Sequence, residues 1–166
     1  SHLILLTGTD VDNFSALQSA ISLFDSSKHA LKCHVHVANV ENRALFEEKG
    51  VFFPPIRKNG IEISLFNVFD NIAIALFQRY PLGERADTLA ADSDSVNILL
   101  AGFGTLGEAV LVEIMQMAHF GNQKPTRIVV LDDDASVAER NFLHRYREVK
   151  NHINGAGLKL WDLEFI

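Results

Sequence analysis

The stretch 96–134 constrains the fold of this chain more than any other part of it. An apolar run typical of a buried strand leads directly into Gly102, Gly104 and Gly107. A helical pattern comes next, then a second apolar run, and then three consecutive aspartates, 132–134. Strand, glycine-rich turn, helix, strand and acid, in that order, predict a β-α-β unit of the kind that binds a dinucleotide.

The spacing of the three glycines suggests a separate role for each. Gly102 permits a tight turn out of the strand, Gly104 lets a pyrophosphate approach the backbone, and Gly107 lets the next helix pack closely on the sheet. A helix that begins near Thr105 directs free N–H groups and the positive end of its dipole toward the phosphates. The residues expected to contact the cofactor here are Gly102, Phe103, Gly104, Thr105, Leu106 and Gly107.

The acidic run after the second strand is expected to bind the adenosine ribose. Asp132 follows the strand immediately and is the first choice to accept hydrogen bonds from the ribose hydroxyls, with Asp133 second. Three neighbouring carboxylates would repel a 2′-phosphate, so the sequence favours NAD over NADP. The alternative is that the glycines serve only the fold and the site holds no ligand.

The whole chain predicts an α/β fold with a doubly wound parallel sheet. Six apolar runs alternate with helical patterns, in the order βαβαβα, linker, βαβαβ. A dinucleotide-binding domain normally begins with its glycine strand and has the spatial order 3-2-1-4-5-6. Here residues 1–82 correspond to strands 4, 5 and 6, residues 83–95 to a linker, and residues 96–166 to strands 1, 2 and 3. We expect a Rossmann-like sheet of about six strands in this permuted order.

The two halves could complete one another in more than one way. A linker of a dozen residues reaches roughly 40 Å when extended, so one chain could close one sheet. Alternatively, the partner of each half lies outside this sequence or in a second copy of the chain, and a homodimer is expected. In a single permuted sheet, Gly8, Thr9 and Asp10 would face the nucleotide across the crevice. An ordinary strand-to-helix turn at these residues is an equal alternative.

Composition excludes several other classes of function. The net charge of −6 argues against nonspecific binding of nucleic acid. No apolar run approaches the roughly 20 residues of a membrane-spanning helix, so the chain is not expected to be embedded in a membrane. The single cysteine, Cys33, indicates a buried thiol in a reducing compartment, and a cytoplasmic location follows. The chain opens directly on an apolar run, which suggests a segment of a longer protein.

Two patterns resemble catalytic or metal sites without completing one. Tyr146 and Lys150 have the spacing of the Tyr-x-x-x-Lys pair of short-chain dehydrogenases, but they follow the second strand, beside the adenosine end. His34 and His36 alternate along a strand, yet no acid or cysteine cluster is placed to complete a metal site, so we expect two half-buried side chains. No catalytic residue and no metal ligand is predicted. The histidines expected on helix surfaces are His119, His144 and His152.

Residues 96–108 resemble the opening of TrkA-N domains, also called RCK domains, which regulate potassium channels and transporters. Residues 3–10 with Asn13 are similar to the fourth strand and turn of such a domain, and residues 34–38 to its fifth strand. Residues 69–82 are similar to the close of one domain in proteins that carry two in tandem. The resemblance implies the back half of one nucleotide-binding domain followed by the front half of the next.

The resemblance also implies a function and a site. It implies a cytoplasmic regulatory module that binds NAD(H) or another adenine nucleotide and acts on a membrane transport protein. Gly102, Gly104 and Gly107 would line the pyrophosphate, and Asp132 would bind the ribose. Because no glycine loop precedes His2, the nucleotide site of the first domain is not in this sequence. Two alternatives stay open: a fragment of an NAD-dependent oxidoreductase, and a domain kept only for assembly.

Overall fold

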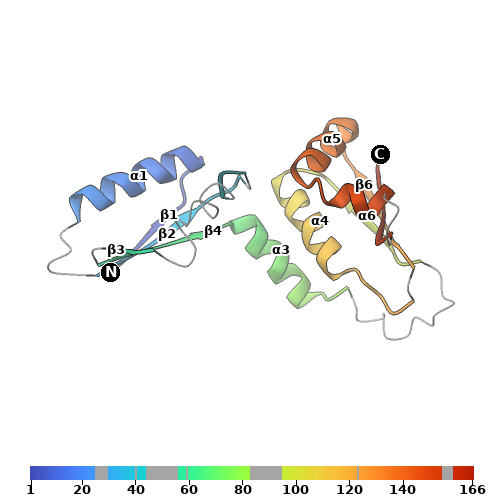
Figure 1. The fold of residues 1–166 in the computed structure, drawn as a ribbon, viewed down its shortest axis with the longest axis horizontal. Helices are drawn as coiled ribbons and strands as arrows, with labels where there is room; N and C mark the ends of the chain where they lie inside the picture. Colours follow the sequence, from blue (N-terminus) through green and yellow to red (C-terminus); the bar gives the residue numbers. More distant parts are fainter. Residues whose placement is uncertain are drawn as a thin grey trace. The chain divides into compact units, whose positions relative to one another are not determined.

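Two compact units make up the chain, one from Ser1 to Val68 and one from Phe69 to Ile166 (Figure 1). No described helix is long and apolar enough to cross a lipid bilayer. The computed structural model describes residues 1–24, 30–39, 41–43, 56–58, 60–82, 95–122, 124–154 and 159–166.

The first unit is a four-stranded sheet covered on one face by helix α1 (Asp10–Leu23) (Figure 1). The strand order is β1-β2-β4-β3, with the first three strands parallel and β3 antiparallel at the edge. These strands are β1 (His2–Leu5), β2 (Leu31–His36), β3 (Ile56–Lys58) and β4 (Ile61–Phe66). Alternate residues of β2 and β4 are buried, as expected for a sheet with one covered face. The core consists of Leu5, Leu17, Leu31, Cys33, Val35, Val37, Ile61, Ile63 and Leu65.

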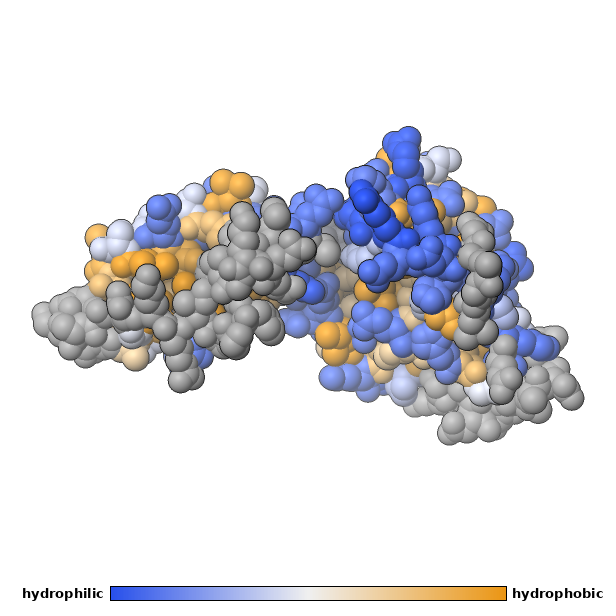
Figure 2. Space-filling model, viewed as in Figure 1, coloured by the Kyte–Doolittle hydropathy of each residue, from blue (hydrophilic) through white to orange (hydrophobic). Residues whose placement is uncertain are grey.

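The second unit is a three-stranded parallel sheet in the order β5-β6-β7. Its strands are β5 (Asn97–Ala101), β6 (Thr126–Leu131) and β7 (Trp161–Phe165). Its helices are α3 (Val68–Arg79), α4 (Thr105–Met117), α5 (Ala135–Arg145) and α6 (Val149–Asn154). The apolar sides of α3, α4 and α5 enter one core around β6, and the face of this unit seen in Figure 2 is largely hydrophilic.

The prediction of an α/β fold with parallel strands is confirmed, and each of the six expected strands is present. The described strands form two sheets, and the sequence left open whether the two halves share one sheet. Each sheet has the strand order of one half of a doubly wound sheet, and β1 and β5 are edge strands of their own sheets. The permuted single sheet stays a prediction.

Strand β3 was not predicted, because residues 51–59 looked irregular. It is only three residues long, which is too short for an alternating pattern to be recognised, and its pairing with β4 creates it. Gly60, between the two strands, has a φ of 76°, a conformation that glycine adopts at no steric cost. A glycine at this position therefore suits the turn that joins β3 to β4.

The boundary between the units lies before α3, not after it as the sequence suggested. Ala73 and Phe77 of α3 are 1% and 9% exposed and belong to the core cluster of the second unit. The expected boundary at residue 82 therefore separates α3 from the residues it packs on. The expected linker, 83–95, lies outside the described residues except for its last residue.

The helical pattern that follows β6 in the sequence predicts a single helix over about 135–151. The structure has two helices there, because the chain leaves helical geometry at Tyr146 (φ −107°, ψ 65°). The Tyr146 ring packs on Phe142, with ring centroids 4.8 Å apart. Its hydroxyl forms a hydrogen bond with Glu108 of α4. These contacts lie where α5 ends, and sequence periodicity does not show them.

Candidate functional site

A pocket of about 340 Å³ lies at the carboxyl ends of the parallel strands of the second unit. Backbone hydrogen bonds hold these strand ends together: the N–H of Gly102 donates to Leu131 O (2.8 Å), and that of Asp132 to Ile166 O (3.0 Å). Ligands of open parallel sheets bind outside this edge. The lining residues are Gly102, Leu131, Asp132, Asp133 and Ile166. Three of these five were predicted, and the other two are at the ends of neighbouring strands.

Gly102 and Gly107 form the turn that leads from β5 into α4. Gly102 has a φ of 90°, in the region that favours glycine. A Cβ at Gly107 would overlap the backbone carbonyl oxygen of Gly102, so only glycine allows α4 to pack this closely on the turn. These are the geometric roles that the glycine spacing predicts.

Gly104 is the N-cap of α4, and no side chain caps the helix there. A Cβ at Gly104 would meet no protein atom within 4 Å, so the space above this residue is open. The first N–H groups of any helix have no partner within the helix. The exposed residues Thr105 and Leu106 carry such groups next to the open space. The start of α4 therefore offers N–H donors and the positive end of its dipole to an anion.

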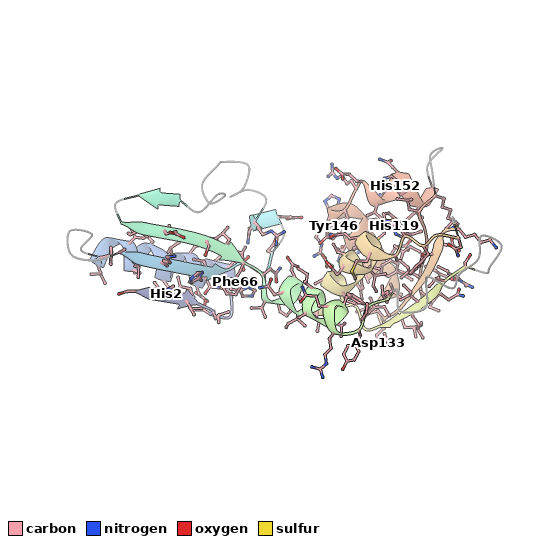
Figure 3. The ribbon with its side chains drawn as sticks, turned by 90° about the horizontal axis from the view of Figure 1, so that it is seen from below. His2, Phe66, His119, Asp133, Tyr146 and His152 are labelled. Atoms are coloured by element: carbon pink, nitrogen blue, oxygen red, sulfur yellow. The ribbon has the colours of Figure 1, made fainter. Side chains whose placement is uncertain are left out.

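Asp132 holds the glycine turn in position. Its Oδ2 accepts a hydrogen bond from the backbone N–H of Phe103 at 2.7 Å, and its Oδ1 accepts one from that of Asp134 at 3.1 Å. A carboxylate has about four lone-pair sites, so both oxygens can still accept a further hydrogen bond. Asp132 is half-buried and the neighbouring Asp133 is exposed at the pocket (Figure 3).

The side chain of Phe103, which was predicted among the ligand contacts, packs against other aromatic rings of the protein. Its ring meets Phe142 and Phe165 edge-on, with centroids 5.7 Å and 5.1 Å away. Its N–H donates to Asp132. Phe103 therefore anchors the turn in the core, and these contacts do not direct its side chain toward the pocket.

Glu108 was not predicted as a site residue, and it connects the start of α4 to α5. It is 8% exposed, and its carboxylate lies 2.8 Å from the Arg145 guanidinium. Burial raises the pKa of Glu108, although the charge of Arg145 and a hydrogen bond with Tyr146 oppose the shift. An acid directly after the third glycine was the available signal, but its partner lies 37 residues away.

Tyr146 has the properties of a structural side chain. Burial and the Glu108 carboxylate raise the pKa of Tyr146 to about 12. A catalytic tyrosine in a Tyr-x-x-x-Lys pair has to release its hydroxyl proton easily, whereas the raised pKa of Tyr146 means that its hydroxyl retains the proton. The helix is also interrupted between Tyr146 and Lys150, so the two do not lie on one continuous helix face.

The turn at the end of β1 is held together by its own side chains. The Thr9 hydroxyl accepts a hydrogen bond from the N–H of Asp12 (3.1 Å) and caps α1. Asp10 is 9% exposed and accepts hydrogen bonds from Ala38 N (2.8 Å), Asn39 N (3.1 Å) and Asn42 Nδ2 (2.9 Å). These bonds favour the second interpretation of this turn, in which it only joins strand and helix.

The hydrogen bonds to Asp10 favour its charged form. Burial raises the pKa of Asp10, but the hydrogen bonds from Asn42, Ala38 and Asn39 outweigh burial and the pKa is lowered. Gly8 is exposed, with no atom within 4 Å of an added Cβ. Gly8, Thr9 and Asp10 belong to the first unit, and a site shared with the glycine turn stays a prediction.

The two histidines of β2 are half-buried, as predicted. His34 Nδ1 lies 2.8 Å from Ser64 Oγ, and its Nε2 lies 3.3 Å from Nδ1 of the stacked His2. Hydrogen bonds and stacking therefore account for His34. Across the described parts of the chain, no three side chains of histidine, cysteine, aspartate or glutamate gather in a way that could hold a metal ion.

Comparison with known proteins leaves the site to be judged on its own geometry. Scans against protein-family models, curated proteins and solved structures find no match to the chain. The resemblance to TrkA-N domains therefore stays a prediction. The features of this chain that bear on function are the glycine turn, the start of α4 and the carboxylates at the strand ends.

Proposed function

We propose that the second unit binds NAD(H), or another adenine nucleotide, at the glycine turn. The observation that carries the proposal is the uncapped start of α4 at Gly104, with open space where a side chain would be. A helix start left without a side-chain cap is weaker than a capped one. A bound phosphate would satisfy the same N–H groups and give a reason for the missing cap.

The ribose and the choice of cofactor follow from the acids beside the turn. Asp132 lines the pocket and keeps lone pairs for the two ribose hydroxyls. Asp133 and Asp134 are exposed next to it. A 2′-phosphate would bring a further negative charge into this group, so NAD is favoured over NADP.

We extend the proposal to the complete fold. The order β5-β6-β7 corresponds to strands 1, 2 and 3 of a dinucleotide-binding sheet, and β1-β2-β4 to strands 4, 5 and 6. Pairing of the edges of β5 and β1, within one chain or between two copies in a homodimer, would give the full order. In that sheet the turn with Gly8 would lie across the crevice from the nucleotide.

The proposed role is regulation in the cytoplasm rather than catalysis. The glycine turn has phosphate and ribose contacts, while Tyr146, the residue that most resembles a catalytic one, is held by Glu108. By its resemblance to TrkA-N domains, the chain would pass nucleotide binding on to a potassium channel or transporter. An NAD-dependent oxidoreductase and a ligand-free assembly domain are the outcomes that the test below distinguishes.

The test is a thermal-shift series with NAD, NADH, NADP, ATP and AMP. We expect NAD or NADH to raise Tm, and Gly104→Ala to abolish the shift because the added methyl fills the space above the turn. Gly121→Ala is the matched control, since Gly121 lies in the same unit and also has open space. No shift with any nucleotide, or an unchanged shift in Gly104→Ala, would overturn the proposal.

A second variant tests the ribose contact. Asp132→Asn keeps an oxygen for the N–H of Phe103 and removes the charge, while the N–H of the exposed Asp134 loses its acceptor. We expect nucleotide affinity to fall roughly tenfold, as for loss of one charge-assisted hydrogen bond. Turnover of a nicotinamide cofactor with a range of alcohols would favour the oxidoreductase instead.

A further inference from the structure

A second pocket, of about 370 Å³, lies in the second unit where α5 gives way to α6. It is bounded by the second half of α4, by the residues of that break, and by the first residue of β7. It shares none of its described lining residues with the pocket at the glycine turn. Figure 3 shows His119, Tyr146 and His152 gathered on one side of this unit, away from Asp133.

The pocket is built mainly from aromatic and aliphatic side chains. Trp161 and Phe142 are 8% and 0% exposed, and Tyr146 is half-buried beside them. The exposed imidazoles of His119 and His152 each have a centroid 5.7 Å from that of Trp161, at interplanar angles of 42° and 79°. Flat rings at several orientations around one indole favour a flat ligand, because aromatic pairs gain from stacked and edge-on contacts.

Trp161 also has a polar atom without a partner. Its indole Nε1 is buried, and the described part of the chain offers it no hydrogen-bond acceptor. Buried N–H groups nearly always have a partner. A ligand with an acceptor atom in its ring plane could supply one once a neighbouring side chain moves aside, since Nε1 is buried in the structure. This is the feature that favours a heterocycle over a hydrocarbon.

The charges at the pocket argue against an anion. Glu148 is the only described lining residue with a carboxylate, and none of the described lining residues is a lysine or an arginine. A phosphate or carboxylate ligand would therefore meet repulsion and no fixed cation. The described residues also provide no set of metal ligands here. The size of the pocket is at the lower end of the range for small-molecule sites.

We infer that this pocket binds an uncharged, planar nitrogen heterocycle of one or two rings, stacked among the aromatic side chains, with a ring nitrogen accepting from Trp161 Nε1–H. The inference does not rest on the proposed nucleotide site. Residues on both sides of the interruption between α5 and α6 line the pocket, Phe142 before it and Val149 and His152 after it.

The test uses the intrinsic fluorescence of Trp161, the only tryptophan in the chain. The full chain is titrated with benzimidazole in slightly alkaline buffer, where the probe carries no charge. We expect a saturable change in emission. Indene has nearly the same shape but no nitrogen, and we expect it to bind roughly tenfold more weakly because it leaves the indole N–H unpaired.

Variants separate this site from a structural effect and from the glycine turn. His152→Ala is expected to weaken benzimidazole binding, whereas His144→Ala, an exposed histidine outside the pocket, is expected to leave it unchanged. Gly104→Ala is also expected to leave it unchanged. Trp161→Phe, followed by calorimetry, should remove the preference for benzimidazole over indene. No saturable change, equal affinity for the two probes in the unmodified protein, or equal loss in His152→Ala and His144→Ala would overturn the inference.

Discussion

The turn after β1 and the turn after β5 occupy the same place in their two units, yet they are built in opposite ways. The first is closed by side chains: Thr9 caps α1, and Asp10 takes three hydrogen bonds. The second is left open, with a glycine cap and space above Gly104. The same topology thus gives a turn with a side-chain cap in one unit and an uncapped helix start in the other. Side-chain chemistry at the turn, rather than the fold, decides which of them can accept a ligand.

The largest effect is expected from Asp10→Ala, which would leave the N–H groups of the half-buried Ala38 and of Asn39 without their acceptor. We expect the first unit to lose about 3 kcal/mol of unfolding free energy, since hydrogen bonds to a charged group contribute more than neutral ones. Hydrogen exchange at the two amides measures the loss. Asp133→Ala, at an exposed position in the other turn, is the control. Unchanged protection of both amides would show that Asp10 does not close this turn.

Gly107→Ala should have the next largest effect, because its methyl would overlap the carbonyl oxygen of Gly102. We expect a loss of about 2 kcal/mol, the range found when an overpacked site forces the backbone to move. Urea unfolding followed by Trp161 fluorescence measures it. Gly104→Ala, with open space, should change stability little. Equal losses of stability in the two variants would mean that Gly104 is as tightly packed as Gly107, and that no open space lies above it.

Thr9→Ala removes the side-chain cap of α1. A loss of about 1 kcal/mol is expected, and Thr9→Ser should restore most of it because serine also caps helices. Urea unfolding of the first unit measures the loss of stability, and hydrogen exchange at the amide of Asp12 reports the lost cap. A serine variant as unstable as the alanine variant would point to packing of the threonine methyl instead.

Gly104→Ser transfers the design of the first turn to the second. Serine at the N-cap should add a few tenths of a kcal/mol of stability to the second unit. The same side chain would occupy the space proposed for the phosphate, so the thermal shift with NAD should disappear while Tm without ligand rises slightly. A serine variant that still responds to NAD would contradict the proposed site.

The final prediction concerns pH: acidification should reduce the stability contribution of Asp10 in the first unit and raise that of Glu108 in the second. The lowered pKa of Asp10 stabilises the folded state above the unfolded pKa, and this contribution is lost as pH falls through the folded pKa. The raised pKa of Glu108 works in the other direction: its ionised form costs stability, and acidification relieves that cost. From neutral pH to below about 4, the advantage of the unmodified protein over Asp10→Asn should shrink, and its stability relative to Glu108→Gln should rise.

Local pattern predicted the part of the second unit that runs from β5 to β6. The start of β5, the glycine turn and Asp132 are where the sequence placed them, because hydrophobic period and glycine spacing are local signals. The outcomes that differed depend on contacts between distant residues. Tyr146 lies at the end of α5 and bonds to Glu108 of α4, and no pattern along the chain contains that pair.

The candidate sites divide in the same way. Gly102 and Asp132 were found from spacing alone, whereas Ile166 lines the same pocket only because parallel strands end together. For Asp10 the sequence left a nucleotide-facing turn and an ordinary turn open, and its three donors, distant in sequence, favour the ordinary turn. The pocket beside Trp161 had no sequence signal, since its walls come from three helices and a strand.

The position of α3 has a consequence for how the chain folds during synthesis. Ala73 and Phe77 leave the ribosome before α4 and β6, the elements whose core they join, have been made. Domains generally fold as units while the chain emerges, so α3 would wait with its apolar side uncovered after the first unit is complete. The helix that closes one strand-helix series in the sequence is therefore the first piece of the next unit to be built.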